Sequence, residues 1–277
     1  MDTFVCKEQY TLADFKLLIS FLRSENGCPW DKVQTHSSIR RNLLEEAYEL
    51  AECIDQNDTE HMKEELGDVL MQVLFHTDIE ADAGHFTLDD VCDHACKKLV
   101  SRHPNLFGEK TDLDWDQLKR LEHGEETVGD EMRRVSKSLP ALWRADKIQK
   151  KAAKTGYDWP DVHDALDKIE EEAQELREGV DAHDADNIIE ELGDLIFATV
   201  DAARMLGVDP EMAVHRACEK AIGRISFMEQ QALQEGHQLS DLSLAEMEQL
   251  HQKARQTLEG KTPVYDKLDY FRSVSTK

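Results

Sequence analysis

Four acidic side chains occur twice in this chain with the same internal spacing. The first set is Glu46, Glu49, Glu65 and Asp68, and the second is Glu172, Glu175, Glu191 and Asp194. Each member of the second set lies 126 positions after its counterpart. Carboxylate oxygens suit Mg²⁺ or Mn²⁺, and bound Mg²⁺ usually also takes substrate phosphate oxygens as ligands. The pattern therefore predicts two divalent-cation sites that can polarise a phosphoryl group and activate a water molecule.

The surrounding sequence predicts that an antiparallel pair of helices carries each set. Apolar residues recur at helical spacing over 43–55 and 60–83, and again over 165–179 and 187–206. Polar turns separate the helices of each pair, and we expect Thr59 to cap the second helix of the first pair. Glu49 and Glu65 then lie roughly 12 Å from the turn on opposite helices, at 1.5 Å per residue. Each set is expected to form one ring of carboxylates between two helices.

The apolar residues of the later helix in each pair cover a wide face, which one neighbouring helix cannot bury. We therefore expect an all-α protein built as helical bundles of four or more helices, with two-chain assembly supplying part of the cover. Repetition of the acidic pattern predicts two tandem domains. The predicted boundaries are an N-terminal domain at 1–122, a linker at 123–137, a C-terminal domain at 138–260 and a tail at 261–277.

Composition narrows the partners and the compartment. The net charge of −25 over 277 residues disfavours nucleic acid as a partner. A run of about 18 apolar residues, which a membrane-spanning helix needs, does not occur. The six cysteines contain no C-x-x-C pair, and Cys92 and Cys96 with His94 lack the second pair expected of a zinc finger. These features predict a cytoplasmic protein with reduced thiols.

Basic residues near the acidic sets are candidates for phosphate binding. Lys220 and Arg224 are four apart, as are Lys98 and Arg102, although such a pair is more often a solvated helix face. Lys168 precedes the second acidic set by one turn, whereas its first-half counterpart is Asn42. Charge balance therefore favours the second half as the phosphate site.

Several motifs, taken together, resemble those of the MazG family of nucleoside triphosphate pyrophosphohydrolases. The first half carries Gly27-Cys28-Pro29-Trp30-Asp31-Lys32, Gln34-Thr35-His36, Leu44-Glu45-Glu46-Ala47-Tyr48-Glu49, Glu65-Leu66-Gly67-Asp68 and Arg102-His103-Pro104. The second half carries Ser138-Leu139-Pro140-Ala141-Leu142, Lys147-Ile148-Gln149-Lys150, Gly156-Tyr157-Asp158-Trp159 and Glu191-Leu192-Gly193-Asp194. The resemblance spans nearly the whole chain.

The resemblance implies two tandem MazG-like all-α domains, a homodimer, and Mg²⁺-dependent hydrolysis of a nucleoside triphosphate to the monophosphate and pyrophosphate. It implies metal ligation by Glu172, Glu175, Glu191 and Asp194. It implies a nucleotide site lined by Lys168, Glu171, Glu190, Lys220 and Arg224, with the C-terminal domain as the main catalytic unit. Asn187 and His251 stand where some relatives have lysine and tryptophan, so these positions of the substrate site depart from the family.

The leading hypothesis is that a metal-held water, or one positioned by Glu171 or Glu172, attacks phosphorus. Lys168, Lys220 and Arg224 would neutralise the leaving pyrophosphate. The N-terminal set, with Glu45, Lys98 and Arg102, forms a second site of undetermined activity. A nucleotide- or metal-sensing regulator without turnover and a helical interaction scaffold are the alternatives. A di-iron carboxylate bundle is disfavoured because it needs Glu-x-x-His on two helices, and Glu248 to His251 is the one instance.

Overall fold

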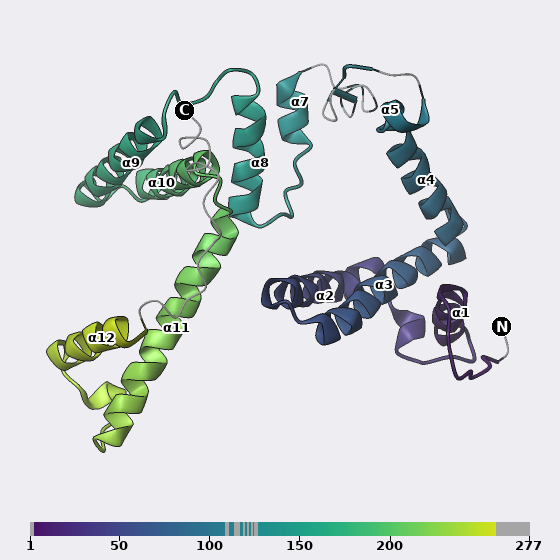
Figure 1. Ribbon diagram of the computed structural model, residues 1–277, viewed down its shortest axis with the longest axis horizontal. Coiled ribbons are helices and arrows are strands. Elements are labelled where there is room, and N and C mark those ends of the chain that lie inside the picture. The colour runs from purple at the N-terminus through teal and green to yellow at the C-terminus, as the bar shows by residue number, and fades with distance from the viewer. Residues whose placement is uncertain are drawn as a thin grey trace. The chain divides into compact units, whose positions relative to one another are not determined.

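The computed structural model describes residues 3–108, 111–113, 117, 118, 120, 122, 124 and 127–258. These residues form helices and turns, and none of them lies in a β-strand, which confirms the all-α prediction. The chain divides into two compact units, Met1–Lys119 and Arg120–Lys277 (Figure 1). The predicted tail at 261–277 and part of the predicted linker lie outside the described residues.

Unit 1 is built around an antiparallel pair, α2 and α3. Its helices are α1 (Leu12–Arg23), α2 (His36–Gln56), α3 (Thr59–Asp82), α4 (Leu88–Ser101) and α5 (Pro104–Phe107), with a 3₁₀ turn at Asp31–Val33. A small core of Ile19, Ile39, Leu74 and Phe75 joins α1 to this pair. Capping boxes at Thr11 and Thr35 fix where α1 and α2 begin, because each threonine accepts a hydrogen bond from a backbone N–H of the first turn.

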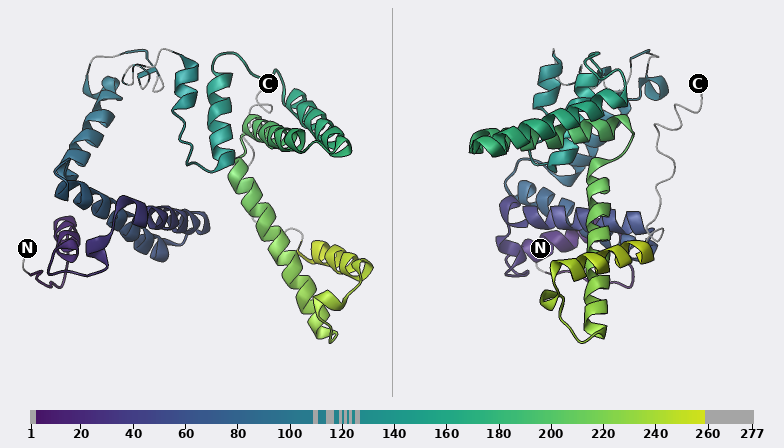
Figure 2. Two further views of the ribbon diagram at one scale, coloured as in Figure 1. Left: turned by 180° about the vertical axis from the view of Figure 1, so that it is seen from behind. Right: turned by 90° about the vertical axis from the view of Figure 1, so that its left-hand side faces the viewer.

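Unit 2 repeats the antiparallel pair as α9 and α10, which lie side by side (Figure 2). Its helices are α7 (Val128–Arg133), α8 (Ala141–Ala153), α9 (Val162–Ala182), α10 (Ala185–Met205), α11 (Pro210–Gln234) and α12 (Leu244–Leu258). A 3₁₀ turn at Leu239–Asp241 joins the last two. Helix α8 packs against α10, and α11 packs chiefly against α12. Helix α7 falls within the predicted linker at 123–137 and packs against α8.

The turns of the two helix pairs are identical in design. Asn57 and His183 end α2 and α9 in the left-handed conformation, each with φ of 56°. Asp58 and Asp184 follow, and each accepts a hydrogen bond from a backbone N–H in the first turn of the next helix. The prediction that Thr59 caps the second helix is wrong, because Asp58 is the cap and Thr59 is already helical. Both predicted helix pairs are confirmed, and their helices extend further toward the turns.

The wide apolar faces predicted for α3 and α10 are only partly covered within the chain. Leu74 and Val200 are buried, but six apolar residues of these helices keep between 36% and 53% of their surface exposed: Leu66, Leu70, Val73, Leu192, Ile196 and Phe197. Three of these side chains lie on α3 and three on α10, so each unit exposes an apolar helix face of its own. Among the described residues, each face is therefore only partly covered.

Candidate active site

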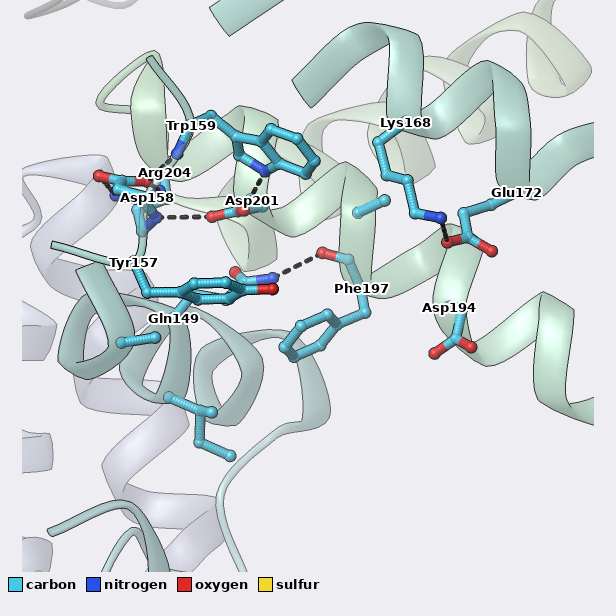
Figure 3. A pocket seen from close by; sticks show the side chains of 13 residues that line it. Gln149, Tyr157, Asp158, Trp159, Lys168, Glu172, Asp194, Phe197, Asp201 and Arg204 are labelled. Atoms are coloured by element: carbon cyan, nitrogen blue, oxygen red, sulfur yellow. Dashed lines mark hydrogen bonds and ion pairs between the residues drawn. The ribbon is translucent and has the colours of Figure 1, made fainter. Parts of the chain in front are cut away.

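Three glutamates of unit 2 converge between α9 and α10. Glu172 and Glu175 lie one turn apart on α9, and Glu191 faces them from α10; a carboxylate oxygen of each lies within 4.8 Å of the others. We call these three residues the C-terminal acidic cluster. Glu172 is buried at 6% exposure, and Asp194, the fourth predicted ligand, lies with it on the wall of one cavity (Figure 3). The antiparallel pairing thus brings the predicted carboxylates together.

Proximity makes these carboxylates hard to ionise together. Removal from water raises the pKa of Glu175, and repulsion from Glu191 and Glu172 raises it further. Desolvation likewise raises the pKa of Glu191, partly offset by a hydrogen bond that Asn187 Nδ2 donates to Glu191 Oε1 at 2.9 Å. A divalent cation would relieve this repulsion, because it favours the charged form of every group around it.

Lys168 supplies the positive charge nearest the cluster. Its Nζ lies 2.6 Å from Glu171 Oε1 and 2.7 Å from Glu172 Oε1. These hydrogen bonds raise the pKa of Lys168, first through Glu171 and then through Glu172, so the ammonium group stays charged at neutral pH. The buried Glu172 carboxylate is therefore paired with a side chain that can also reach a phosphate.

The corresponding site in unit 1 has the same acids without the lysine. Glu46, Glu49 and Glu65 form the N-terminal acidic cluster, again with one oxygen of each within 4.8 Å of the others. Desolvation raises the pKa of Glu46, with added repulsion from Asp68 and Glu49, and desolvation also raises the pKa of Glu65. The Oε2 atom of Glu65 is buried and has no hydrogen-bond partner.

Both clusters fit a hard divalent cation. Each offers three carboxylates at mutual distances that one ion can bridge, and oxygen-only donors match Mg²⁺ or Mn²⁺ rather than a soft metal. The orphaned Glu65 oxygen in unit 1 and the raised pKa values in both units are what a metal site shows without its ion.

A cavity of about 440 Å³ opens beside the C-terminal acidic cluster (Figure 3). At one side lie Lys168, Glu172 and Asp194, and at the other lie aromatic and amide side chains contributed by α8, α10 and the loop before α9. Its full lining is Ile148, Gln149, Ala152, Tyr157, Asp158, Trp159, Lys168, Glu172, Asp194, Phe197, Ala198, Asp201 and Arg204. Gln149, Phe197, Asp201 and Arg204 were not among the predicted site residues. Two of the motifs quoted above, Lys147-Ile148-Gln149-Lys150 and Gly156-Tyr157-Asp158-Trp159, carry part of this lining, whereas no motif contains Phe197, Asp201 or Arg204.

An ion-pair network fixes the loop that carries Trp159. The indole Nε1 donates to Asp201 Oδ2 at 2.8 Å, and Arg204 Nε donates to Asp201 Oδ1 at 2.7 Å. Arg204 also bonds to Asp158, the residue before Trp159. These bonds hold the loop against α10. The same helix carries Glu191 and Asp194, so the position of the Trp159 ring is coupled to the helix that presents these acids.

The remaining predicted site residues divide into two groups. Asn187 and Glu190 lie on α10 beside Glu191, with Asn187 orienting Glu191 and Glu190 exposed; Glu45 of unit 1 is also exposed. Among the described residues, no hydrogen bond or ion pair joins Lys220, Arg224 or His251 to the C-terminal acidic cluster, whose partners are Lys168 and Asn187. These residues lie on α11 and α12, which pack against each other. In unit 1, Lys98 lies on α4 and Arg102 caps that helix.

Among the described residues, no helix combines the length and the apolar character needed to cross a lipid bilayer.

Comparison with known proteins agrees with the geometry of the site. Residues 34–107 and 162–226 match the family described as the MazG nucleotide pyrophosphohydrolase domain, so each acidic cluster lies in one copy. A nucleoside triphosphate pyrophosphohydrolase/pyrophosphatase MazG of Thermotoga maritima is 39% identical over 247 residues, covering 87% of this chain and 95% of that protein. A nucleoside triphosphate pyrophosphohydrolase of Escherichia coli is 36% identical over 242 residues, covering 83% and 91%. The protein YabN of Bacillus subtilis is 43% identical over 258 residues, covering 90% of this chain and 52% of that protein.

Proposed function

Because the chain belongs to the MazG family of nucleotide pyrophosphohydrolases, we propose that it hydrolyses nucleoside triphosphates to nucleoside monophosphates and pyrophosphate. The observation that supports this reaction most directly is the convergence of Glu172, Glu175 and Glu191 beside a cation, Lys168. A phosphate chain carries several negative charges, so its site must combine metal-binding carboxylates with basic side chains.

We propose Mg²⁺ as the metal, held by Glu172, Glu175, Glu191 and Asp194, with Mn²⁺ as a substitute. Bound there, the metal would supply Lewis-acid polarisation of a phosphoryl oxygen. Glu171 or Glu172 accepts a proton from the attacking water and orients it toward phosphorus. Lys168 lies one turn away on the same helix and can move from Glu171 to the phosphate chain, where it neutralises developing charge.

The C-terminal domain, at 138–260, is proposed as the main catalytic unit. Its acidic cluster has Lys168, and the counterpart in unit 1 is Asn42, which cannot neutralise phosphate charge. The N-terminal cluster retains the metal-binding acids without that cation. We propose that the N-terminal domain, at 1–122, binds metal more than it turns over substrate.

A homodimer is proposed as the working form. The half-exposed apolar faces of α3 and α10 give each chain a surface that a second copy can bury. Lys220, Arg224 and His251 point to the same conclusion, because a second copy could bring its own α11 and α12 to the site that they do not reach within one chain. The acidic net charge supports binding of nucleotides rather than nucleic acid. We propose a cytoplasmic location, which the free cysteines support.

The test is product analysis with the full chain, Mg²⁺ and a mixture of nucleoside triphosphates, followed by phosphorus NMR. Pyrophosphate and nucleoside monophosphate are the expected products. Glu172→Gln is expected to abolish turnover, whereas Glu178→Gln, an exposed glutamate on the same helix, is expected to leave it unchanged. Orthophosphate and nucleoside diphosphate as main products would refute the proposal, as would full activity of the Glu172→Gln variant.

A further inference from the structure

We propose that Gly179 and Asn187 form a positioning pair for Glu191, in which the missing side chain of Gly179 makes room for the amide that holds this carboxylate. The proposal rests on the proposed function, because it takes Glu191 as one of the carboxylates that hold the metal. Neither Gly179 nor Asn187 contributes a carboxylate of its own. Both residues act on the orientation of a carboxylate that is already part of the C-terminal acidic cluster.

Gly179 lies where the backbone does not require a glycine. It is buried near the end of α9, and its φ is not among the positive ones, so alanine can adopt the same conformation. Within a helix, glycine is less favourable than alanine because it loses more conformational freedom on folding. A Cβ placed on Gly179 would lie 2.4 Å from Asn187 Oδ1, far inside van der Waals contact. The close approach of the Asn187 amide therefore explains why this position is a glycine.

The amide of Asn187 lies between Gly179 and Glu191. Its Nδ2 donates to Glu191 Oε1 at 2.9 Å. A carboxylate only accepts hydrogen bonds, so the amide nitrogen must face Glu191, and the amide oxygen faces Gly179. Hydrogen bonds of this kind orient metal-binding side chains, and their loss typically lowers metal affinity by roughly 10–100-fold. Asn187 therefore holds one oxygen of Glu191 while the carboxylate faces Glu172 and Glu175.

Unit 1 has the same acids without this pair. The positions 126 residues earlier are Cys53 and His61, so a residue with a side chain replaces Gly179 and an imidazole replaces the amide. His61 Nδ1 lies 2.6 Å from Asp58 Oδ2, at the beginning of α3. The Oε2 atom of Glu65, the counterpart of the positioned acid, is buried without a hydrogen-bond partner. Among the described residues, the positioning pair is therefore a feature of unit 2.

Two substitutions separate the positioning role from simple helix packing. Gly179→Ala pushes the short Asn187 side chain aside and so breaks its bond to Glu191. Asn187→Ala removes the same bond, and it also removes the atoms that the new Cβ would strike. The nearest remaining atom to a Cβ at position 179 is then Ile188 Cγ1 at 3.5 Å, an ordinary van der Waals distance. Gly179→Ala is therefore harmful only while Asn187 is present.

The experiment measures binding of Mn²⁺ alone by electron paramagnetic resonance, in the full chain carrying Glu49→Gln. This substitution removes one acid of the N-terminal acidic cluster, so the tight Mn²⁺ site that remains is that of unit 2. Gly179→Ala, Asn187→Ala and the double variant are compared with this parent. Each single substitution is expected to weaken Mn²⁺ binding by roughly tenfold or more. The double variant is expected to bind no more weakly than Asn187→Ala, because both substitutions break the same bond.

The melting temperature of metal-free unit 2 provides a second readout. Added to Asn187→Ala, Gly179→Ala is expected to raise it, because alanine is the better helix former and no longer meets the amide. Added to the parent, the same substitution is expected to raise it less, because it also costs the bond to Glu191. Gly223→Ala is the control within α11, where the new Cβ lies 3.9 Å from Leu258 Cδ1, and it should leave Mn²⁺ affinity unchanged.

Two results would overturn the proposal. One is an Asn187→Ala variant that binds Mn²⁺ as tightly as the parent, a result that needs no change at Gly179. The other is a double variant in which the two losses of affinity add, since Gly179→Ala would then act through the packing of α9 and not through Asn187. Failure of the proposed function is a separate outcome: Mn²⁺ binding that depends on Asn187, without release of pyrophosphate from nucleoside triphosphates, would preserve the positioning pair and refute the reaction.

Discussion

Lys168 Nζ lies 2.7 Å from Glu172 Oε1, and this ion pair gives the acidic cluster of unit 2 a positive charge that the cluster of unit 1 lacks at the equivalent position. In unit 1 the same helical position is Asn42, and the acids there have no lysine one turn before them. The two copies therefore hold the same carboxylates at different net charge. A single substitution at Lys168 or at Asn42 would therefore change the net charge of one cluster to that of the other.

Lys168→Met is expected to destabilise unit 2 in the absence of metal, because Glu172 is buried and would lose its charged partner. A hydrogen bond to a charged group contributes about 1–3 kcal/mol, and the partial exposure of Lys168 places the loss near the lower end. Added Mg²⁺ should raise the melting temperature of this variant more than that of the unaltered protein. Lys97→Met removes an exposed ion pair with Asp93 and serves as the control, with a smaller change expected. An unchanged melting temperature for Lys168→Met would contradict the pairing.

Glu175→Gln is expected to abolish the effect of metal on unit 2 while leaving the folded chain intact. The substitution removes a carboxylate that is repelled by Glu191 and Glu172, so the metal-free variant should melt no lower than the parent. Mg²⁺ should then give no stabilisation of unit 2, since a ligand stabilises only the state that binds it, whereas unit 1 keeps its own acidic cluster and its response to Mg²⁺. Hydrolysis should fall by roughly 100-fold or more, given that even outer-sphere changes cost 10–100-fold. Thermal melts with and without Mg²⁺ provide the measurement, and an undiminished Mg²⁺ shift would count against the site.

The stabilisation by Mg²⁺ is expected to decrease as the pH falls. The raised pKa values of Glu175 and Glu191 mean that these groups gain protons at a higher pH than an ordinary glutamate, whose pKa is 4.5. A carboxyl whose pKa is raised by folding favours the folded state below its unfolded pKa, and that contribution is lost as the pH rises through the folded value. Metal-free unit 2 should therefore become more stable as these glutamates gain protons, because protonation relieves the repulsion that bound metal relieves at neutral pH. The melting shift caused by Mg²⁺ at pH 7.5 should exceed that at pH 5, and equal shifts would disprove the argument.

A histidine pair gives unit 1 a pH dependence of the opposite sign. His36 Nδ1 lies 2.7 Å from His76 Nδ1, and His36 Nε2 lies 2.6 Å from Glu80 Oε1. Burial lowers the pKa of His76, and the nearby charge of His36 lowers it further. Hydrogen bonds from His85 and His36 lower the pKa of Glu80. A depressed pKa contributes stability above the unfolded value, near 6.5 for histidine, and that stability is lost on acidification.

The histidine pair can be tested with the residue that unit 2 has at the matching position. His76→Ala copies Ala202, and it should make the unfolding of unit 1 less sensitive to pH between 8 and 5.5. His163→Ala, at an exposed histidine of unit 2, should leave the pH profile unchanged. Calorimetric melts across the pH range supply the readout. A profile for His76→Ala as steep as that of the parent would show that the pair is not responsible.

Asp201→Ala is expected to loosen the loop that carries Trp159. It removes the acceptor of the indole N–H and one of two acidic partners of Arg204, whose side chain is 11% exposed. Leaving buried donors unsatisfied costs about 1–3 kcal/mol, so unit 2 should unfold at lower urea. The emission of Trp159 should also shift to longer wavelength as the ring meets water. Asp181→Ala, at an exposed aspartate of α9, is the control, and equal urea midpoints for the two variants would contradict the network.

The sequence by itself determined the helix pairs and the meeting of their acids. Helical spacing of apolar residues and a polar break between two runs are local properties, so they can be recognised without tertiary information. The heights of Glu172 and Glu191 follow from counting residues on either side of one turn, because the rise per residue of an α-helix is constant. The repeat of 126 positions then predicted the second cluster from the first.

Only the tertiary structure decided what lies beside those acids. Gln149 and Phe197 are 48 residues apart, and their hydrogen bond depends on the rotation of α8 against α10, which no local spacing encodes. The same holds for Arg204 with Asp158, and for the separation of Lys220 from the acidic cluster, which follows from the packing of α11 against α12. Spacing fixes contacts within a helix or across one tight turn, whereas contacts between distant helices depend on how side chains pack at each interface.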